Sequence, residues 1–294
     1  MSGLLEAAEA LLLAGDPNGT NARTDASPLL AAARHQLPQV TTALLVARAD
    51  PLQSQRGSGA FPLLVAAADG TSDVVSILLE AKSDVHQRCA ADGETPILAA
   101  SRSFHIDVAA QLLAAGANPG ELSHNHRQAP TFPLLLAAEQ GCLPYAQLLL
   151  TFSADPKQVH PEGSVFPLMA AAKGGHLSVV QELLVSRADA CQIHRSTGDF
   201  PLLTAARSGH ALVLEFLLAS KSDIWQANTK TGSMPLLECA RHGHLPVMEL
   251  LLERRADANQ FNTRAPQITA LSLARQHTDM PELEGLLKRC EAFC

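Results

Sequence analysis

The chain has 294 residues, of which 47% are hydrophobic, 4% aromatic and 17% charged, and its net charge is −7. Because aromatic side chains are too few to fill one thick core, we expect many thin layers of alanine and leucine. The large apolar fraction excludes a disordered chain. The acidic balance argues against a general nucleic-acid binder, whose surface would be basic.

A repeat of about 34 residues organises the chain. We predict a single solenoid over residues 1–294, in which residues 1–27 form a truncated N-terminal capping unit, with its second helix and loop at 4–18. Seven repeats occupy 28–269, and 270–294 form a degenerate C-terminal capping unit whose Glu282 faces water. An Asp or Asn follows each anchor proline by 22 residues, and the anchors stand at positions 28, 62, 96, 133, 167, 201 and 235.

Each repeat is predicted to be a pair of short helices followed by an extended turn. Proline suits the first helical position, where its missing N–H would be unbonded in any case. A glycine eight residues later, as at Gly70 and Gly175, ends that helix. The second helix carries apolar residues four apart, such as Val179 and Leu183. Helices this short are unstable alone, so the predicted fold is all-α: stacked helix-turn-helix repeats with protruding loops or short β-hairpin-like turns.

These residues resemble the ankyrin repeat, whose consensus contains Gly-x-Thr-Pro-Leu-His, then Gly-His, a helix with Val-Val and Leu-Leu, and Gly-Ala-Asp. The best local matches are Gly93-Glu94-Thr95-Pro96-Ile97, Gly175-His176 with the helix to Leu184, and Gly116-Ala117-Asn118. The resemblance covers nearly the whole chain and rests on seven units that keep phase. It implies a stack in which the first helices and the loop tips line a concave groove.

Two departures from the family pattern carry information. Phenylalanine replaces the family threonine before the anchor at Phe61, Phe132, Phe166 and Phe200. The exchange is favourable only if the rings are covered, so we favour a buried ladder over the alternative, an exposed apolar ridge for a partner. After the second helix, the family glycine is replaced by residues that we interpret as solvated helix caps in the left-handed conformation rather than as a binding patch: Arg48, Lys82, Ser153, Arg187, Lys221 and Arg255.

No catalytic, cofactor-binding or metal-binding motif stands out in the sequence. We assign the loop 121–128, three residues longer than its counterparts, to a solvated tip, and we do not take its His124 and His126 as metal ligands. The remaining histidines that look suggestive occupy one turn position of the repeat, which explains them structurally: His105, His176, His210 and His244.

Neither membrane insertion nor secretion is indicated. The longest apolar runs fall far short of the roughly 18 residues that a membrane span needs, and the first basic residue is Arg23, unlike a secretory signal. The six cysteines include no C-x-x-C pair, and Cys290 and Cys294 lie four apart only incidentally. A reducing compartment fits this usage, so we expect a cytoplasmic protein, with the nucleus also compatible.

The candidate partner-binding residues lie six positions beyond the anchors, where the resemblance implies a face turned toward a partner. The eight residues at this position are Arg34, Ala68, Arg102, Glu139, Lys173, Arg207, Arg241 and Gln276, and five of them are basic. Two interpretations of Lys173, Arg207 and Arg241 stay open: a positive row suited to an acidic peptide, or side chains that only solvate the groove. Trp225, the single tryptophan, is either an exposed interface anchor or a cover for the next unit, and Tyr145 is assigned to packing.

We therefore predict a non-catalytic scaffold, a monomer that binds a protein or peptide partner through Arg102, Lys173, Arg207, Arg241 and Trp225, with an acidic partner suited to the row. No cofactor and no nucleic acid are expected. Two alternatives remain: a structural subunit or spacer of a larger assembly, and an enzyme whose loop-built site leaves no signature. For the scaffold, changing Arg207 and Arg241 to glutamate should abolish binding while leaving helical content and melting unchanged.

Overall fold

The computed structural model describes residues 15–21, 23–123, 131–161, 165–276 and 281–291. Within these ranges the chain forms sixteen helices and two short strands. Its contacts divide it into two units: unit 1 comprises Met1–Leu136 and Leu148–Ala154, and unit 2 comprises Ala137–Gln147 and Asp155–Cys294. The boundary falls within the helix pair α8 (Pro133–Gln140) and α9 (Leu143–Thr151).

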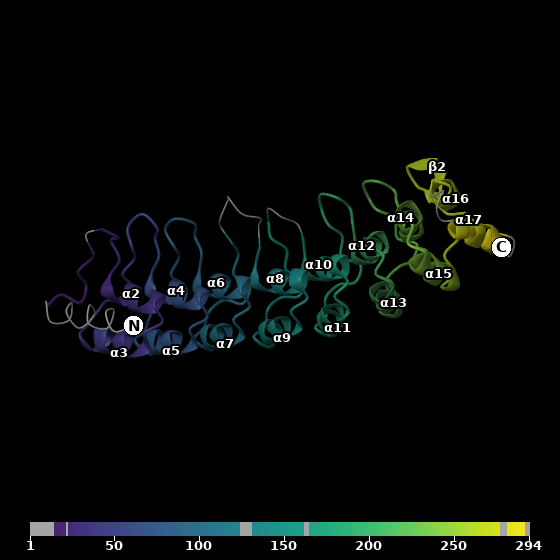
Figure 1. Ribbon diagram of the computed structural model, residues 1–294. Coiled ribbons are helices and arrows are strands. Elements are labelled where there is room, and N and C mark those ends of the chain that lie inside the picture. Colours follow the sequence, from purple (N-terminus) through teal and green to yellow (C-terminus); the bar gives the residue numbers. More distant parts are fainter. Residues whose placement is uncertain (1–14, 22, 124–130, 162–164, 277–280, 292–294) are drawn as a thin grey trace. The chain divides into compact units, whose positions relative to one another are not determined.

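Unit 1 contains three complete helix pairs in which first helices stack on first helices and second helices on second helices. The first helices are α2 (Pro28–Arg34), α4 (Pro62–Ala68) and α6 (Pro96–Arg102). The second helices are α3 (Pro38–Val46), α5 (Ser72–Glu80) and α7 (Ile106–Ala114). Figure 1 shows the two rows, with the loops extending from the row of first helices.

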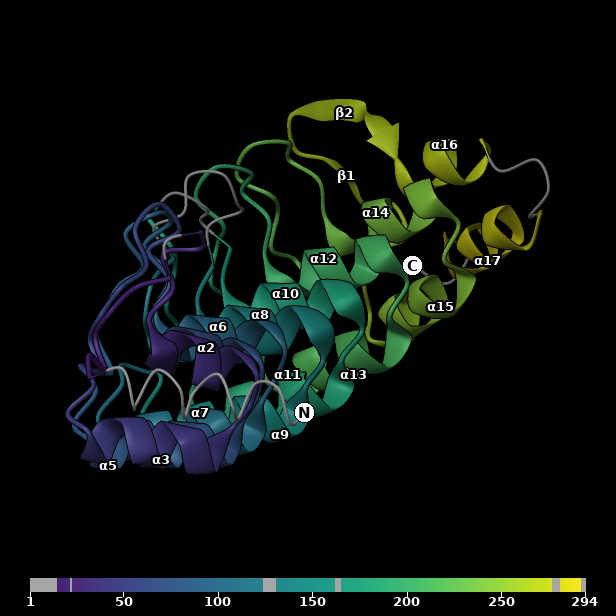
Figure 2. The same cartoon turned by 60° about the vertical axis from the view of Figure 1, so that its left-hand side comes forward.

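Unit 2 repeats this arrangement and ends in the degenerate pair. Its first helices are α10 (Pro167–Gly174), α12 (Pro201–Ser208), α14 (Pro235–His242) and α16 (Ala270–Ala274). Its second helices are α11 (Leu177–Val185), α13 (Ala211–Ala219), α15 (Leu245–Glu253) and α17 (Pro281–Glu291). Figure 2 shows α10 and α12 in one row and α11 and α13 in another. One loop closes as an antiparallel hairpin of β1 (Phe261–Asn262) and β2 (Ala265–Thr269).

The core lies between the two helix rows and is built from leucine, alanine and the phenylalanines that precede the first helices. Phe61, Phe132, Phe166 and Phe200 are fully buried, so the expectation of core rings is confirmed and the exposed ridge is wrong. Tyr145 is also fully buried, as expected. Thr95 keeps the family residue, yet its hydroxyl has no hydrogen-bond partner in the described structure. The hydrophobic effect has therefore replaced capping at these helix starts.

The Asp or Asn that marks each repeat shapes the start of the loop. Its side-chain oxygen accepts a hydrogen bond from the backbone N–H two residues later, an Asx turn, as in Asp223 with Trp225 at 2.8 Å. Asp16 forms the same turn, so the loop of the truncated first unit follows the pattern, whereas most of its predicted helix lies outside the described residues. The turn recurs at Asp50, Asp84, Asn118, Asp155, Asp189 and Asp257.

Both helices of a repeat end in the left-handed conformation. After α2 and α6 the left-handed residue is Gln36 or Phe104, and after the other anchored first helices it is a glycine such as Gly175 (φ 74°), which lies against the imidazole of His210 in the next repeat. The Nε2 atom of His210 is 2.9 Å from the carbonyl oxygen of Lys173, which accounts structurally for the repeated histidines. Beyond the second helices, the predicted left-handed backbone is confirmed with φ between 61° and 68° at Arg48, Lys82, Ser153, Arg187, Lys221 and Arg255.

Glutamines join neighbouring loops within each unit. Gln87 donates through Nε2 to the carbonyl oxygen of Leu52 at 2.9 Å, and Gln192 makes the same bond to Lys157 at 3.3 Å. Because residues in an extended segment alternate in direction, the residues on either side of each glutamine face outward. The loops are thus held at a fixed spacing by side chains, with only one pair of strands among the described residues.

Candidate partner-binding site

The predicted basic positions lie at the C-terminal ends of the first helices. In unit 1, Arg34 and Arg102 line a hollow of about 460 Å³ on this face, together with Asp69, Asp92 and Glu94. Arg102 is paired with Glu94 through Nε at 2.8 Å and a second nitrogen at 3.3 Å. Acidic groups therefore outnumber basic ones in this hollow, and it is not a positive surface.

In unit 2, Lys173 on α10 lines a hollow of about 450 Å³ with Glu139, Val165 and Met169. Burial raises the pKa of Glu139, and the positive charge of Lys173 offsets part of that rise. The Lys173 side chain is exposed and forms no ion pair within 4 Å among the described residues. Of the predicted row in unit 2, it is the cation best placed to meet a partner.

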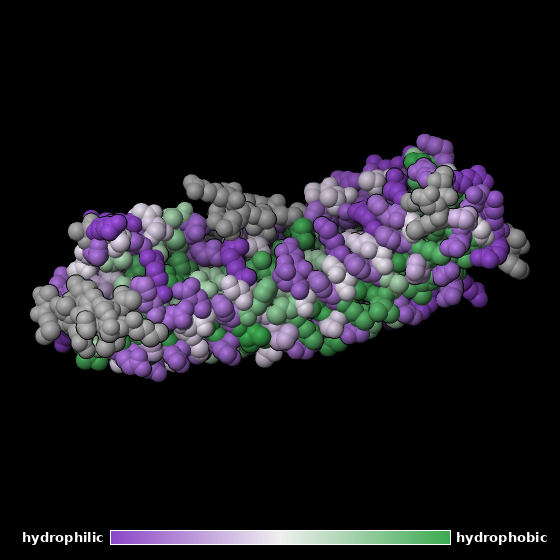
Figure 3. Space-filling view, in the orientation of Figure 1, coloured by the Kyte–Doolittle hydropathy of each residue, from purple (hydrophilic) through white to green (hydrophobic). Residues whose placement is uncertain are grey.

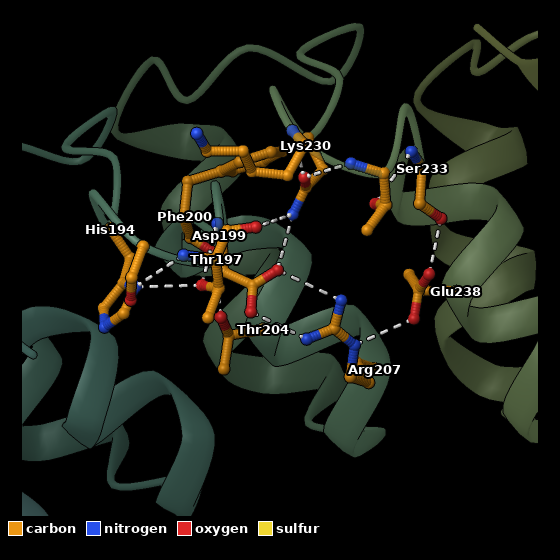
Figure 4. A network of polar contacts seen from close by, with 12 residues as sticks. His194, Thr197, Asp199, Phe200, Thr204, Arg207, Lys230, Ser233 and Glu238 are labelled. Atoms are coloured by element: carbon orange, nitrogen blue, oxygen red, sulfur yellow. Dashed lines mark hydrogen bonds and ion pairs between the residues drawn. The ribbon is translucent and has the colours of Figure 1, made fainter. Parts of the chain in front are cut away.

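Arg207 is already occupied by carboxylates of its own chain (Figure 4). Its guanidinium donates to both oxygens of Asp199 at 3.0 and 3.1 Å and, through Nε, to Glu238 at 2.8 Å. Asp199 precedes α12, which carries Arg207, and Glu238 lies on α14 of the following repeat. Arg207 thus ties two successive repeats together through a loop and two helices.

Glu238 is the unusual residue of this network, because the same position in the other repeats is apolar or threonine. Its side chain is 7% exposed and accepts hydrogen bonds from Ser233 and Arg207. Burial raises the pKa of Glu238, but those hydrogen bonds and the charges of Arg207 and Arg241 outweigh burial, so its pKa lies below the usual value. The Arg241 Nε atom lies 3.8 Å from the same carboxylate.

Asn228 and Asp199 extend the network into the neighbouring loop. The Asn228 amide donates to Asp199 at 2.7 Å and to the carbonyl oxygen of Thr197 at 3.1 Å. Its own oxygen accepts the backbone N–H groups of Lys230 and Thr231. Asn228 is buried, so these contacts fix the backbone of the loop that carries Trp225.

These contacts change the interpretation of the predicted positive row. Arg102, Arg207 and Arg241 lie where the repeat places them, but each is close to a carboxylate. Because a glutamate at position 207 would face the carboxylates of Asp199 and Glu238, we now expect charge reversal there to lower the melting temperature rather than leave it unchanged. A sequence signal for the pairing exists: an acid stands eight residues before Arg102 and Arg207, and before no other basic residue of the row.

Trp225 is half exposed, at 50% of its surface, on a loop whose backbone is fixed by the Asx turn of Asp223. An exposed indole on a fixed backbone offers a large contact area to a partner. Figure 3 shows mostly hydrophilic residues over the loops that lead to β1 and β2, with hydrophobic residues over the helices below them. Trp225 is one of the exposed large apolar side chains in the loops of unit 2, together with Ile193 and Phe261.

The expectations about metal ligands, paired cysteines and membrane spans can be compared with the structure only where it describes the residues concerned. His124 and His126 lie outside the described residues, as do the side chains of Cys290 and Cys294. Within the described ranges, no group of three or more His, Cys, Asp or Glu residues is arranged to hold a metal ion. A search of the same residues finds no helix with the length and apolarity to cross a membrane.

Stacked pairs of short helices joined by protruding loops define a helical repeat protein. A family model described as ankyrin repeats (3 copies) matches residues 29–123, 134–228 and 168–262. The crystal structure of the human ASB11 ankyrin repeat domain matches with a TM-score of 0.65 and 22% identity, over 78% of this chain and 98% of that one. No curated protein matches the chain. The chain belongs to the ankyrin repeat family, whose repeats are generally protein-protein interaction modules.

Proposed function

We propose that the protein is a non-catalytic scaffold that binds a protein or peptide partner through the first-helix face and the loops of unit 2. The observation that carries the proposal is Trp225, half exposed on a loop that the Asp223 turn and the Asn228 network hold in place. Lys173 supplies an exposed cation on α10 that suits an acidic side chain of the partner. Arg207 contributes indirectly, because it stabilises the loops.

The proposed organisation is a single solenoid over 1–294 that acts as a monomer in a reducing compartment such as the cytoplasm. Seven first helices begin at the anchor prolines, which supports the predicted repeat boundaries. The two hollows on the first-helix face are open and lined by mixed charges, an arrangement suited to contacts with a protein surface. Nucleic acid remains a poor candidate because the chain is acidic.

The test is capture of partners from cell extract with crosslinking, followed by affinity measurement on the purified partner. We expect Trp225→Ala to weaken binding at least about tenfold, and Lys173→Glu to weaken it in a salt-dependent manner. Leu52→Ala is the matched control, because Leu52 occupies the equivalent loop position of the first repeat and is 44% exposed. Equal effects of Trp225→Ala and Leu52→Ala would refute the assignment of the loop.

A further inference from the structure

A second surface lies on the side of the second helices in unit 2. There the C-terminal ends of α11 and α13 and the following loops enclose a hollow of about 590 Å³. Lys157, Arg187 and Lys221 supply its cations, and Leu184, Val185 and Phe216 its main apolar lining. Lys173 and Trp225 are not among its lining residues, but Lys157 and Cys191 belong to the loops of unit 2 and hold the loop position that Trp225 holds in its own repeat.

The three cations are available for a ligand. No side-chain hydrogen bond or ion pair occupies Lys157, Arg187 or Lys221 among the residues that the structure describes. The acid in the lining is Asp189, and its Oδ1 already accepts the backbone N–H of Cys191 at 2.9 Å. The hollow therefore has a positive charge on a chain whose net charge is −7.

The charged side chains of Arg187 and Lys221 are not needed to cap the helices, because backbone hydrogen bonds cap them. The backbone N–H of Arg187 bonds to the carbonyl oxygen of Leu184 at 3.1 Å, and that of Lys221 bonds to Leu218 at 3.2 Å. The next backbone N–H groups, of Ala188 and Ser222, bond to Leu183 at 2.8 Å and Leu217 at 3.1 Å. These bonds need the left-handed backbone at Arg187 and Lys221, where φ is 68° and 67°, but not a charged side chain. The left-handed caps and a cationic surface are thus compatible at the same residues.

An exposed valine completes the surface. Val185, the last residue of α11, is 79% exposed although it lies beside the cations. Apolar area of this kind gains free energy when a partner covers it. The combination of uncovered apolar side chains and unpaired cations favours a ligand that has both an apolar group and negative charges.

We propose that this outer hollow binds an extended acidic segment of a partner protein, in which an apolar side chain lies between carboxylates. The apolar side chain packs on Val185 and Phe216, and the carboxylates contact Arg187 and Lys221. These two cations occupy the same position in successive repeats, and packed helices are separated by about 8–10 Å. One phosphate does not span that distance. In an extended strand, the side chains two residues before and two residues after a central residue point to the same face as that residue and are about 13 Å apart at roughly 3.3 Å per residue, so flexible glutamate side chains on either side of the apolar one reach both cations.

The proposal is tested with the full chain and a fluorescein-labelled synthetic peptide that has leucine at its centre and three glutamates on each side. Fluorescence anisotropy should show binding that weakens at least about tenfold in Arg187→Glu and in Lys221→Glu. Lys82→Glu is the matched control: Lys82 has the same residue type and left-handed position as Lys221 but lies in unit 1. It should change the affinity less than about twofold.

A second pair of variants tests the apolar contact. Val185→Ser should weaken peptide binding, whereas Val46→Ser should not, because Val46 is an equally exposed valine at the same position of the first repeat. A peptide with serine in place of leucine, or glutamine in place of glutamate, should bind more weakly than the parent. Circular dichroism and urea unfolding should be the same for each variant and its control.

Location is tested with Cys191, an exposed free thiol in the lining of the hollow. A peptide carrying a pyridyl-disulfide-activated cysteine at one end should couple to Cys191, as seen by peptide mass mapping, and excess unlabelled peptide should suppress the coupling. The proposal is overturned by absence of peptide binding, by equal loss in Lys221→Glu and Lys82→Glu, by coupling that the unlabelled peptide does not suppress, or by preferential binding to vesicles containing phosphatidylinositol phosphate.

Discussion

Replacing Arg207 with methionine separates a structural role of this residue from a partner-binding role. The substitution keeps most of the side-chain volume and removes three charge-assisted hydrogen bonds, two to Asp199 and one to Glu238. Both carboxylates then stay where they are without their cation. Asn228 still donates to Asp199 and Ser233 still donates to Glu238, so the two acids are only partly deprived of partners.

The expected magnitude follows from burial. The side chains of Asp199 and Glu238 are 16% and 7% exposed, and that of Arg207 is 33% exposed. Breaking a fully buried ion pair costs about 3–5 kcal/mol, and solvent screening at the partly exposed guanidinium reduces this figure. We therefore expect Arg207→Met to lower the free energy of unfolding by about 2–4 kcal/mol.

The loss should also depend on pH. In the wild type the pKa of Glu238 lies below its usual value of 4.5, so Glu238 stabilises the fold above that pH and less as pH falls through its folded pKa. In Arg207→Met, the Glu238 carboxylate stays buried but loses the Arg207 cation that offsets the cost of burial, so its pKa should rise. Protonation should then remove the cost of a buried, unpaired charge. The difference between wild type and variant should thus shrink as pH falls through the raised pKa of Glu238 in the variant, and should continue to shrink until pH passes the lowered pKa of Glu238 in the wild type.

The assay is urea unfolding followed by circular dichroism and by fluorescence of Trp225, the single tryptophan, which reports on a loop beside the network. The control is Arg254→Met, because Arg254 pairs with Glu215 at 2.7 Å on the surface, with side chains 39% and 49% exposed. That change should cost less than about 1 kcal/mol. Equal losses in the two variants, or a difference that does not vary with pH, would refute this reasoning.

Three further predictions concern the repeat itself. Phe200→Ala should lower the free energy of unfolding by about 3–5 kcal/mol, measured in urea, because the ring is fully buried. Gly175→Ala should lower the melting temperature more than Gly116→Ala, although both glycines have positive φ. A Cβ at Gly175 would lie 2.6 Å from a ring nitrogen of His210 in the next repeat, whereas a Cβ at Gly116 would meet open space. In the native protein, iodoacetamide should modify Cys191, which is exposed, and spare Cys239, whose pKa burial raises; mass mapping that shows equal labelling would contradict the described core.

The fold could be predicted because its determinants are local and recur. Proline at each helix start, glycine at its end and the Asp that forms an Asx turn act within a few residues, so their spacing located the helices. Burial of Phe166 and its counterparts could be predicted because covering a phenylalanine ring gains more free energy than the loss of a threonine cap costs. The left-handed backbone at Phe104 and Gln36, with φ of 54° and 58°, was not foreseen, because neither residue type favours it, although both stand eight residues past an anchor proline where other repeats have glycine.

The candidate site could be predicted only in outline. The repeat fixes the place of Arg207, but its guanidinium is paired with Asp199, eight residues earlier, and with Glu238, thirty-one residues later in the next repeat, so it is not available to a partner. The first partner has a recognisable spacing, which Glu94 and Arg102 share. The second does not, because a glutamate at a position that is otherwise apolar or threonine shows its partner only when the helices are placed together.

Hydrogen-deuterium exchange of the full chain, with and without the purified partner, tests the central claim most directly. The account predicts partner-dependent protection in the Lys173 end of α10 and in the loop that carries Trp225, with unchanged exchange in the equivalent loop that carries Leu52. Protection confined to other segments, with no change at Lys173 or Trp225, would contradict the claim that this face of unit 2 binds the partner.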